Sequence, residues 1–242
     1  MTIWLDGNFW NRYFEQVFIP RVNAFCDVIV KRVIPTFANI EQEAEELAQA
    51  EYERMGSLPV ADDTIIDMAD IAEKAQEVGI IYYETISDIR QAIINLGAVG
   101  LYHTFEQQLL FFHRRQVLHP SEENIKSEIN IDELKKRLLG GGVDITSLKS
   151  WPKVDELRLS ANSIKHAEGS AVEQLRKRRP DLFEHPVLKE QGLSALASSP
   201  SVYLPLAGQD IYLTVDHLRE YEKAIISFWR EFGDFIREYS KK

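Results

Sequence analysis

The stretch that decides the fold is Ile80–Val117, IIYYETISDIRQAIINLGAVGLYHTFEQQLLFFHRRQV. Gly97 and Gly100 within it would let another helix approach closely, at a cost of about 1 kcal/mol each relative to Ala. The stretch predicts a long, central and largely buried helix. Its apolar residues recur at the spacing of one helical face, and they are Ile81, Ile86, Ile89, Ile93, Leu96, Val99, Leu101, Phe105, Leu109 and Phe112.

Helical patterns continue on both sides of this stretch. Phe9–Ile34 has an apolar face and is ended by Pro35, and the more polar Phe37–Met55 follows it. Further helices are predicted over Asp132–Leu139, within Asp155–Arg179 and over Val215–Tyr239.

These patterns predict a chain that is mainly all-α and folds as a multi-helix bundle. We expect residues 1–242 to form a single helical domain. Within it, N-terminal helices in residues 1–79 would pack on a bundle formed by about residues 80–240.

One short region breaks the helical rhythm. Val202-Tyr203-Leu204 and Ile211-Tyr212-Leu213 flank the turn-forming Gly208-Gln209-Asp210. This pattern predicts a small β-hairpin at residues 202–213. Because a two-stranded hairpin is marginal alone, it would have to lie on the bundle.

Composition limits the class of protein. The chain has 242 residues, 45% of them hydrophobic, and a single cysteine, Cys26, so an intrachain disulfide or a cysteine-based zinc site is excluded. It has no run of about 18 apolar residues, and the N-terminal MTIWLDGNFW lacks the pattern of a signal peptide. We expect a cytoplasmic protein that does not enter a membrane.

Charge is distributed unevenly along the chain. The net charge of −10 argues against general affinity for nucleic acid. Residues 41–77 hold twelve Asp and Glu against two cations, a local charge of −10. Residues 149–179 hold eight Lys and Arg against four Asp and Glu, a local charge of +4. The second range forms a basic island in an acidic chain.

The basic island contains the candidate site. On a helix, Arg158, Asn162 and His166 stand at i, i+4 and i+8, so they share one face, and Lys165 projects near it. A guanidinium, an amide and an imidazole on one face could converge on an anion.

These residue types suit the cleavage of RNA by its own 2′-hydroxyl. Histidine can exchange a proton near neutral pH, so His166 is a candidate general acid or base. Arg158 could balance charge on the phosphorane, and Asn162 could orient the imidazole or hold a phosphate oxygen. We expect these three to be catalytic. Flanking phosphates would be bound by Lys165, Arg176, Arg178 and Arg179.

Structural roles are the alternative for the same residues. His166 could serve as a cap or dipole partner at the end of its helix, just before Gly169. Arg158 could pair with Asp155 or Glu156, or the basic island could dock on the acidic segment at residues 41–77. In each of these cases the face would not be a catalytic site.

Other catalytic motifs are missing from the sequence. It has neither a phosphate-binding glycine-rich loop nor a Gly-x-Ser-x-Gly elbow. A two-metal carboxylate bundle would need paired Glu-x-x-His motifs, and only the reversed His103-x-x-Glu106 is present. A buried polar pair or a helix-face hydrogen bond is favoured for His103 and Glu106 over a metal site. We expect no metal and no cofactor.

The residues Glu156-Leu157-Arg158, Asn162 and Lys165-His166, late in a helical chain, resemble the HEPN superfamily of helical nucleotide-binding and ribonuclease domains. Tyr102-His103 and Glu106, on the long apolar helix, look like the polar-bearing helix that often faces this motif. The resemblance covers about residues 80–240.

This resemblance implies an activity and an assembly. In catalytic members an Arg and a His lie a few residues apart on one helix, and two protomers typically bring the motif together in a dimer cleft. RNA is cut there without metal, while other members have no nuclease activity. In this chain seven residues separate Arg158 from His166, and three separate Asn162 from His166. The resemblance implies a homodimer, with His103 and Glu106 in a supporting role.

Two classes of function remain open from the sequence. The first is a metal-independent endoribonuclease or RNA-binding effector, of a toxin or defence type. The second is a non-catalytic helical interaction protein that binds a protein partner or a small anion.

Overall fold

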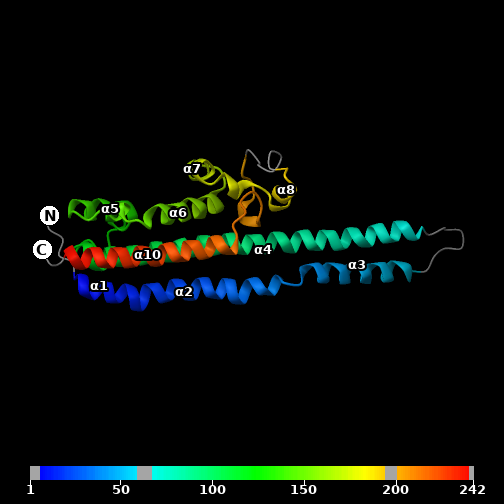
Figure 1. Cartoon of the computed structure of the whole chain (residues 1–242), viewed down its shortest axis with the longest axis horizontal. Helices are drawn as coiled ribbons and strands as arrows, with labels where there is room; N and C mark the ends of the chain where they lie inside the picture. The colour runs from blue at the N-terminus through cyan, green and yellow to red at the C-terminus, as the bar shows by residue number, and fades with distance from the viewer. Residues whose placement is uncertain (1–5, 59–66, 194–200, 240–242) are drawn as a thin grey trace.

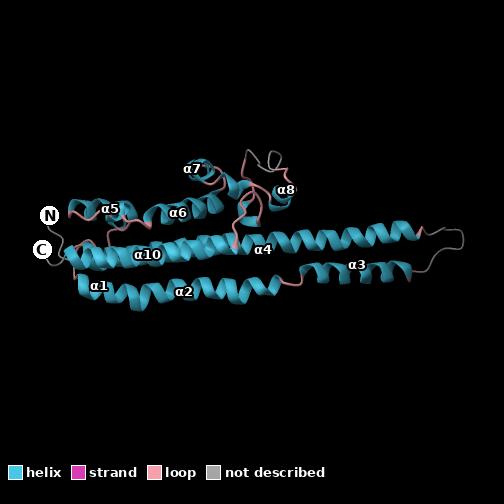
Figure 2. Ribbon diagram, viewed as in Figure 1, coloured by secondary structure: helices cyan, strands magenta, loops and turns pink. Residues whose placement is uncertain are grey.

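The fold is known from a computed structural model, which describes residues 6–58, 67–193 and 201–239. These residues form an all-α bundle that is drawn out along one axis, as Figure 1 shows. The prediction of a helical bundle is confirmed, and Figure 2 shows helices joined by loops throughout the described part of the chain.

The helices lie in three layers (Figure 1). One outer layer holds α1 (Gly7–Tyr13), α2 (Ile19–Val28) and α3 (Ile40–Gly56), the middle layer holds α4 (Met68–Phe112) and α10 (Val215–Tyr239), and the other outer layer holds α5 (Ile131–Gly140), α6 (Trp151–His166), α7 (Ser170–Arg178) and α8 (Pro186–Glu190). Only α3 and the first half of α4 extend beyond the other helices.

The long helix α4 is continuous over 45 residues, with no break at Gly79. Asp67 caps its start, because its carboxylate accepts a hydrogen bond of 2.8 Å from the backbone N–H of Ala69. At 1.5 Å per residue the helix is about 66 Å long, so it runs through the bundle and out of it. A five-residue π turn, His113–Val117, carries the helical path on to Leu118.

The two halves of α4 have different surroundings. In the first half the buried residues are Ile71, Ala75 and Gly79, on the side that packs against α3. The two helices therefore form an arm that projects from the body. The second half is buried on the side that faces the bundle, through Ile94, Ala98, Leu101, Phe105, Leu109 and Phe112.

Part of the apolar stripe of α4 faces solvent. Ile81, Ile89 and Leu96 are 55%, 44% and 45% exposed. The prediction of a largely buried helix therefore holds for the bundle side of the second half and fails for the arm, where α3 covers only one side.

Glycines in α4 allow the close helix contacts that the sequence predicts. The ring of Phe25 from α2 occupies the space where a Cβ of Gly100 would stand. Gly97 lies between Ile29 and Leu218, with side-chain carbons 3.2–3.3 Å from the position of its missing Cβ. The N-terminal helical path (residues 7–37), through Phe25 and Ile29, and α10, through Leu218, can therefore both approach the α4 backbone.

The aromatic face of α10 fills the space between α1, α2 and α4. Trp229 lies at its centre, with ring centroids 4.6 Å from Phe14 and 4.8 Å from Phe18. Its indole N–H donates to the Gln108 side-chain carbonyl at 2.8 Å, and the Gln108 amide donates to the backbone carbonyl of Phe18 at 3.1 Å. A buried ring thus keeps its polar atom paired.

Two prolines in the N-terminal helical path change the pattern of its backbone hydrogen bonds, but the path continues through both. Pro20 follows a π turn at Phe14–Phe18, where the N–H of Ile19 bonds to the carbonyl of Phe14, five residues earlier. This wider turn accommodates a residue that lacks an N–H and crowds the preceding carbonyls. Pro35 lies in a 3₁₀ turn that precedes α3.

The predicted β-hairpin at residues 202–213 is wrong, because no strand forms in this described segment. It contains a 3₁₀ turn at Pro205–Ala207 instead. The Asp210 carboxylate accepts hydrogen bonds from the backbone N–H groups of Tyr203 and Leu204, at 2.8 and 2.9 Å. A local carboxylate therefore pairs the donors that a hairpin would direct to a second strand.

Side chains of α4 hold the rest of this segment. The buried Asn95 amide donates to the carbonyls of Pro205 and Ile211, at 3.0 and 2.8 Å. The Gln91 amide donates to the carbonyl of Leu213 at 2.8 Å. The sequence pattern did not reveal these bonds, since they join residues more than a hundred positions apart.

We expect Gly208→Ala to lower the free energy of unfolding by about 2–4 kcal/mol. Gly208 has φ +91°, and an added Cβ would overlap the backbone carbonyl of Asp88 and lie 2.9 Å from the N of Ala92. Gly140→Ala is the matched control, because nothing lies within 4 Å of its Cβ position and its φ is not positive. Urea denaturation should show little loss for the control, and equal effects of the two changes would contradict this packing.

Candidate functional site

The helix α6 carries the predicted catalytic residues, and its local sequence explains where it begins and ends. Pro152 lies in its first turn, where no backbone N–H is needed. The N–H and hydroxyl of Ser150 both donate to the Glu231 carboxylate at 3.2 Å, which ties the start of α6 to α10. The helix stops at Ala167, whose φ of 52° lies outside the helical region.

The predicted residues on α6 differ in their surroundings. Arg158 and Asn162 are half-buried, whereas Lys165 and His166 are exposed in the last turn. The Nε of Arg158 donates to Asp155 at 2.8 Å, so the guanidinium is held toward the start of α6, away from His166. Since eight residues of helix rise about 12 Å, the structure does not bring Arg158 and His166 together within one chain.

Arg158 lines a cleft between α4, α5 and α6. The cleft has a volume of about 690 Å³, and Glu106 and the buried Tyr102 from α4 line it as well. The structure therefore brings together Arg158 and Glu106, two residues that were selected from separate parts of the sequence.

Charges of both signs border this cleft. Its cations are Lys135 and Arg158, and its carboxylates are those of Glu106, Asp132 and Asp155. The Nζ of Lys135 lies 5.0 Å from the ring centroid of Trp151, which also lines the cleft.

The phenol of Tyr102 adds a hydrogen-bond donor to the cleft. Burial, with an added contribution from Glu106, raises the pKa of Tyr102 to about 12. The phenol therefore stays protonated at neutral pH, and an anion in the cleft could accept its proton in a hydrogen bond.

The predicted supporting pair lies partly outside the cleft. His103 is exposed on α4, with Nδ1 3.3 Å from Glu106 Oε2 and Nε2 3.0 Å from the Gln107 amide. Its contact with the cleft is through Glu106. In the described ranges, no three His, Cys, Asp or Glu side chains are grouped closely enough to hold a metal ion.

Three of the four residues predicted to bind substrate are engaged within the protein. The guanidinium of Arg176 lies 4.3 Å from the ring centroid of Phe183. Arg178 pairs with Asp155 at 3.0 Å, so this carboxylate lies between Arg158 and Arg178. The pair of Arg158 and Asp155 is one of the structural alternatives that the sequence left open for Arg158. Arg158, Asp155 and Arg178 all belong to the basic island.

Asp155 stays ionised between its two partners. Burial raises the pKa of this carboxyl, and hydrogen bonds and charges of Arg158 and Arg178 outweigh that effect, so its pKa lies below its ordinary value. Lys165, the fourth predicted substrate-binding residue, is exposed and has no hydrogen bond or ion pair with a described residue.

Arg179 belongs to a half-buried network between α6, α7 and α10. It donates to Glu156 at 2.6 Å and to Asp181 at 2.7 Å, and it lies 3.0 Å from the Nε2 of His217. Burial and the charge of Arg179 lower the pKa of His217, so the ring is neutral at neutral pH.

Glu156 is the acceptor at the centre of this network. Only 7% of the residue is exposed, and its carboxylate also accepts from Lys153 at 2.9 Å and from the Tyr221 hydroxyl at 3.1 Å. Burial and the nearby Glu156 raise the pKa of Tyr221, which keeps the hydroxyl a donor. Sequence reasoning missed this network, because its only local pairs are Lys153 with Glu156 and Arg179 with Asp181, and the bonds that join these pairs connect distant parts of the chain.

The chain matches no protein-family model, no curated protein and no solved structure. Among the helices of the described residues, none combines the length and the apolar character needed to cross a membrane. Its function therefore has to be inferred from the chemistry of its own side chains.

We expect Arg179→Met to lower the free energy of unfolding by about 2–3 kcal/mol, because it removes one cation from the buried carboxylate of Glu156. Arg178→Met is the matched control: the neighbouring Arg178 is more exposed, and its loss should cost less than about 1 kcal/mol. Thermal and urea denaturation would measure both. A larger loss for Arg178→Met would show that the network is not the structural centre of this region.

Proposed function

We propose that this protein is a metal-independent RNA-binding and RNA-cleaving effector that acts through the exposed side of α6. The observation that carries the proposal is the shared cleft of Arg158, Glu106 and Tyr102. The exposed Lys165 and His166 on the same helix add to it.

The guanidinium of Arg158 is suited to hold a phosphate. Its bond to Asp155 uses Nε, and its two terminal amino groups make no hydrogen bond with the described residues. Those groups can donate to two oxygens of one phosphate, the geometry in which arginine binds anions best. Asp155 keeps the guanidinium in place while it does so.

Other groups of the cleft complete a chemical set for phosphodiester cleavage. The Glu106 carboxylate can accept a proton, and the Tyr102 phenol and Lys135 can donate hydrogen bonds to a developing negative charge. His166 can serve as the second proton-transfer group, since its ring has no hydrogen-bond partner among the described residues.

The separation of Arg158 from His166 bears on the assembly. One chain holds the two groups about 12 Å apart along α6 and turns Arg158 away from His166. A two-fold dimer with antiparallel α6 helices would set Arg158 of each protomer beside His166 of the other. The proposal therefore includes a homodimer in which each active site draws on both chains.

A non-catalytic role is the second candidate. The pairing of Asp155 with both Arg158 and Arg178 favours it, because much of the positive charge of the basic island is then neutralised internally. In that case α6 would bind a small anion or a protein partner without changing it.

The central test is cleavage of RNA in the presence of a chelator. We expect Arg158→Ala and His166→Ala each to lower the rate by about 10²–10⁴. An equal mixture of the two variants should recover about a quarter of the wild-type rate, since half of the dimers are mixed and one of the two sites in each mixed dimer pairs an intact Arg158 with an intact His166. RNA with a 2′-deoxy group at the scissile nucleotide should resist cleavage.

His119→Ala is the control for this experiment, because His119 is also exposed but lies in the loop after α4. Its rate should equal that of the wild type. Activity that persists in both single variants would refute the catalytic roles, and failure of the mixture to recover would place the whole site in one chain. Absence of both cleavage and RNA binding would favour the non-catalytic candidate.

A further inference from the structure

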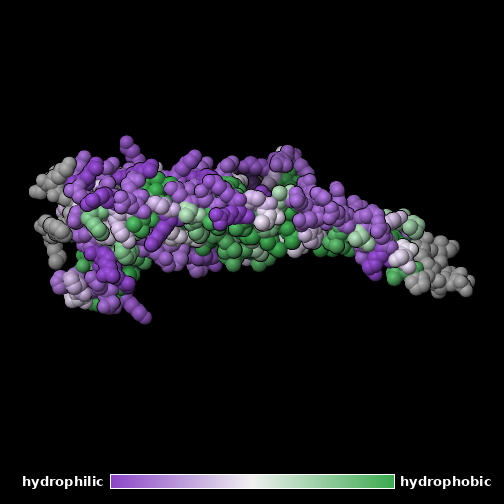
Figure 3. Space-filling view, turned by 90° about the horizontal axis from the view of Figure 1, so that it is seen from below, coloured by the Kyte–Doolittle hydropathy of each residue, from purple (hydrophilic) through white to green (hydrophobic). Residues whose placement is uncertain are grey.

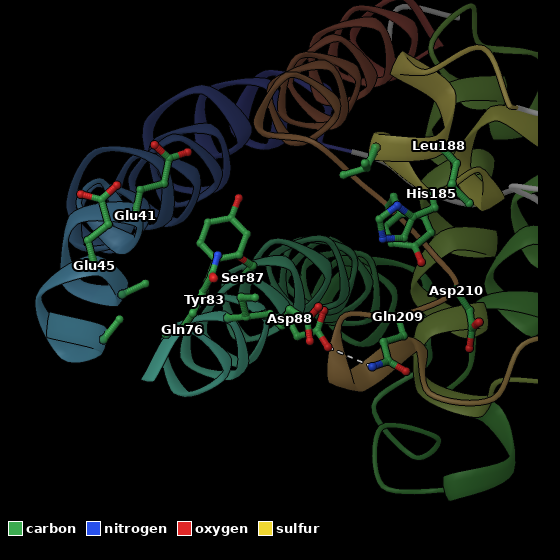
Figure 4. Close-up of a pocket in the computed structure, with 17 residues that line it drawn as sticks. Glu41, Glu45, Gln76, Tyr83, Ser87, Asp88, His185, Leu188, Gln209 and Asp210 are labelled. Carbon is green, nitrogen blue, oxygen red and sulfur yellow. Dashed lines mark hydrogen bonds between the residues drawn. The ribbon is translucent and has the colours of Figure 1, made fainter. Parts of the chain in front are cut away.

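A second concave surface lies at the point where the arm leaves the body, apart from the cleft of α6. This groove has a volume of about 990 Å³. Figure 4 shows α3 and α4 on one side of it, with His185 and Leu188 facing Tyr83 across the opening. The segment around Gln209 forms the remaining wall, and the Gln209 amide donates to Asp88 at 2.9 Å.

Small residues form the floor of the groove. A Cβ on Gly79 would lie 2.9 Å from the carbonyl oxygen of Ala44 and 3.0 Å from the Cβ of Ala48. The floor is therefore a tight contact between α3 and α4, in which Gly79 and Ala44 are buried.

Large apolar side chains rise from the edges of the floor. Ile80, Tyr83 and Val187 all line the groove, and they are 50%, 43% and 52% exposed. Figure 3 shows apolar side chains on the surface along the middle of the molecule and onto the arm. Exposed apolar groups gathered in one groove are typical of a binding site for another protein.

The ionisable rim of the groove is acidic. Five carboxylates line it, and none of its lining residues is Lys or Arg. Three of them, those of Glu41, Glu45 and Glu84, make no hydrogen bond or ion pair with any described residue. The five acidic residues are Glu41, Glu45, Glu84, Asp88 and Asp210.

The length of the groove fits a short helix. Its lining residues on α4 run from Gln76 to Asp88, a rise of about 18 Å. A helix of about 12–14 residues would span this distance.

We propose that the groove between the arm and α8 binds a basic amphipathic helix of another protein. Large aliphatic side chains of that helix would cover Ile80, Tyr83 and Val187. Its lysines or arginines would pair with the carboxylates of Glu41, Glu45 and Glu84. This chain's own basic helix, α7, is a poor occupant, because Arg176 stacks on Phe183 and Arg178 pairs with Asp155.

A peptide of about 14 residues made only of leucine and lysine, with the leucines on one helical face, is the probe. We expect it to bind the full chain with a dissociation constant on the order of 10 μM, as measured by fluorescence anisotropy, and to gain helical circular dichroism. A peptide with glutamate in place of every lysine should not bind. High salt should weaken binding, because the paired charges are exposed.

Two groove variants should weaken binding about tenfold. One combines Glu41→Gln, Glu45→Gln and Glu84→Gln, and the other combines Ile80→Asn and Val187→Asn. All five side chains are exposed, so both variants should keep the melting temperature of the wild type. The control combines Glu46→Gln, Glu53→Gln and Glu73→Gln, which removes the same charge from exposed positions of the arm outside the groove.

Several outcomes would overturn the proposal. Equal loss of affinity in the groove and control charge variants would mean general attraction to an acidic arm. Unchanged affinity in the Ile80 and Val187 variant would place the peptide elsewhere. No binding of the peptide, together with self-association that the groove variants abolish, would make a second copy of this chain the occupant.

Discussion

Burial of one side of the second half of α4 is the constraint on which the rest of the structure depends. Each large apolar side chain from Ile94 to Phe112 contributes roughly 1.5–3 kcal/mol when it leaves water. The aromatic face of α10 and the inner face of α6 cover these residues, and α2 reaches the backbone at Gly100. The first half of α4 lacks such cover, so it projects with α3 as an arm.

Polar groups of α4 fix what packs around it. Asn95 and Gln91 bind backbone carbonyls of the segment before α10, and Gln108 joins Trp229 to the N-terminal helical path. These amides are satisfied only when distant parts of the chain occupy one arrangement. The cleft of Arg158 and the acidic groove both border α4, so the same helix positions both candidate sites.

The sequence predicts the fold class well, because helical periodicity is a local property that each segment carries by itself. It fails for residues 202–213, where alternating apolar residues look like strands. There the backbone bonds go to Asn95, Gln91 and Asp210, and a pattern of neighbours cannot reveal such partners. The exposure of Ile89 and Leu96 escapes the sequence for a similar reason, since periodicity identifies an apolar face and does not say whether anything covers it.

The candidate site was predictable in part. Helical spacing places Arg158, Asn162 and His166 on one face, and their residue types suggest chemistry. Spacing says nothing of the direction in which a long side chain turns, so the bond between Arg158 and Asp155 remained one of several alternatives. The role of Arg179 depended on Glu156 and His217, which α6 and α10 bring to it only in the folded chain.

Amide hydrogen exchange along α4 tests the central claim most directly. The account predicts slow exchange from Ile94 to Phe112, governed by global unfolding, and faster exchange in the arm before Ser87, where one neighbouring helix covers the chain. The arm amides should still be protected without a gap at Gly79, because the helix is continuous. Equal protection of both halves, or an unprotected break at Gly79, would contradict a single helix that is core at one end and arm at the other.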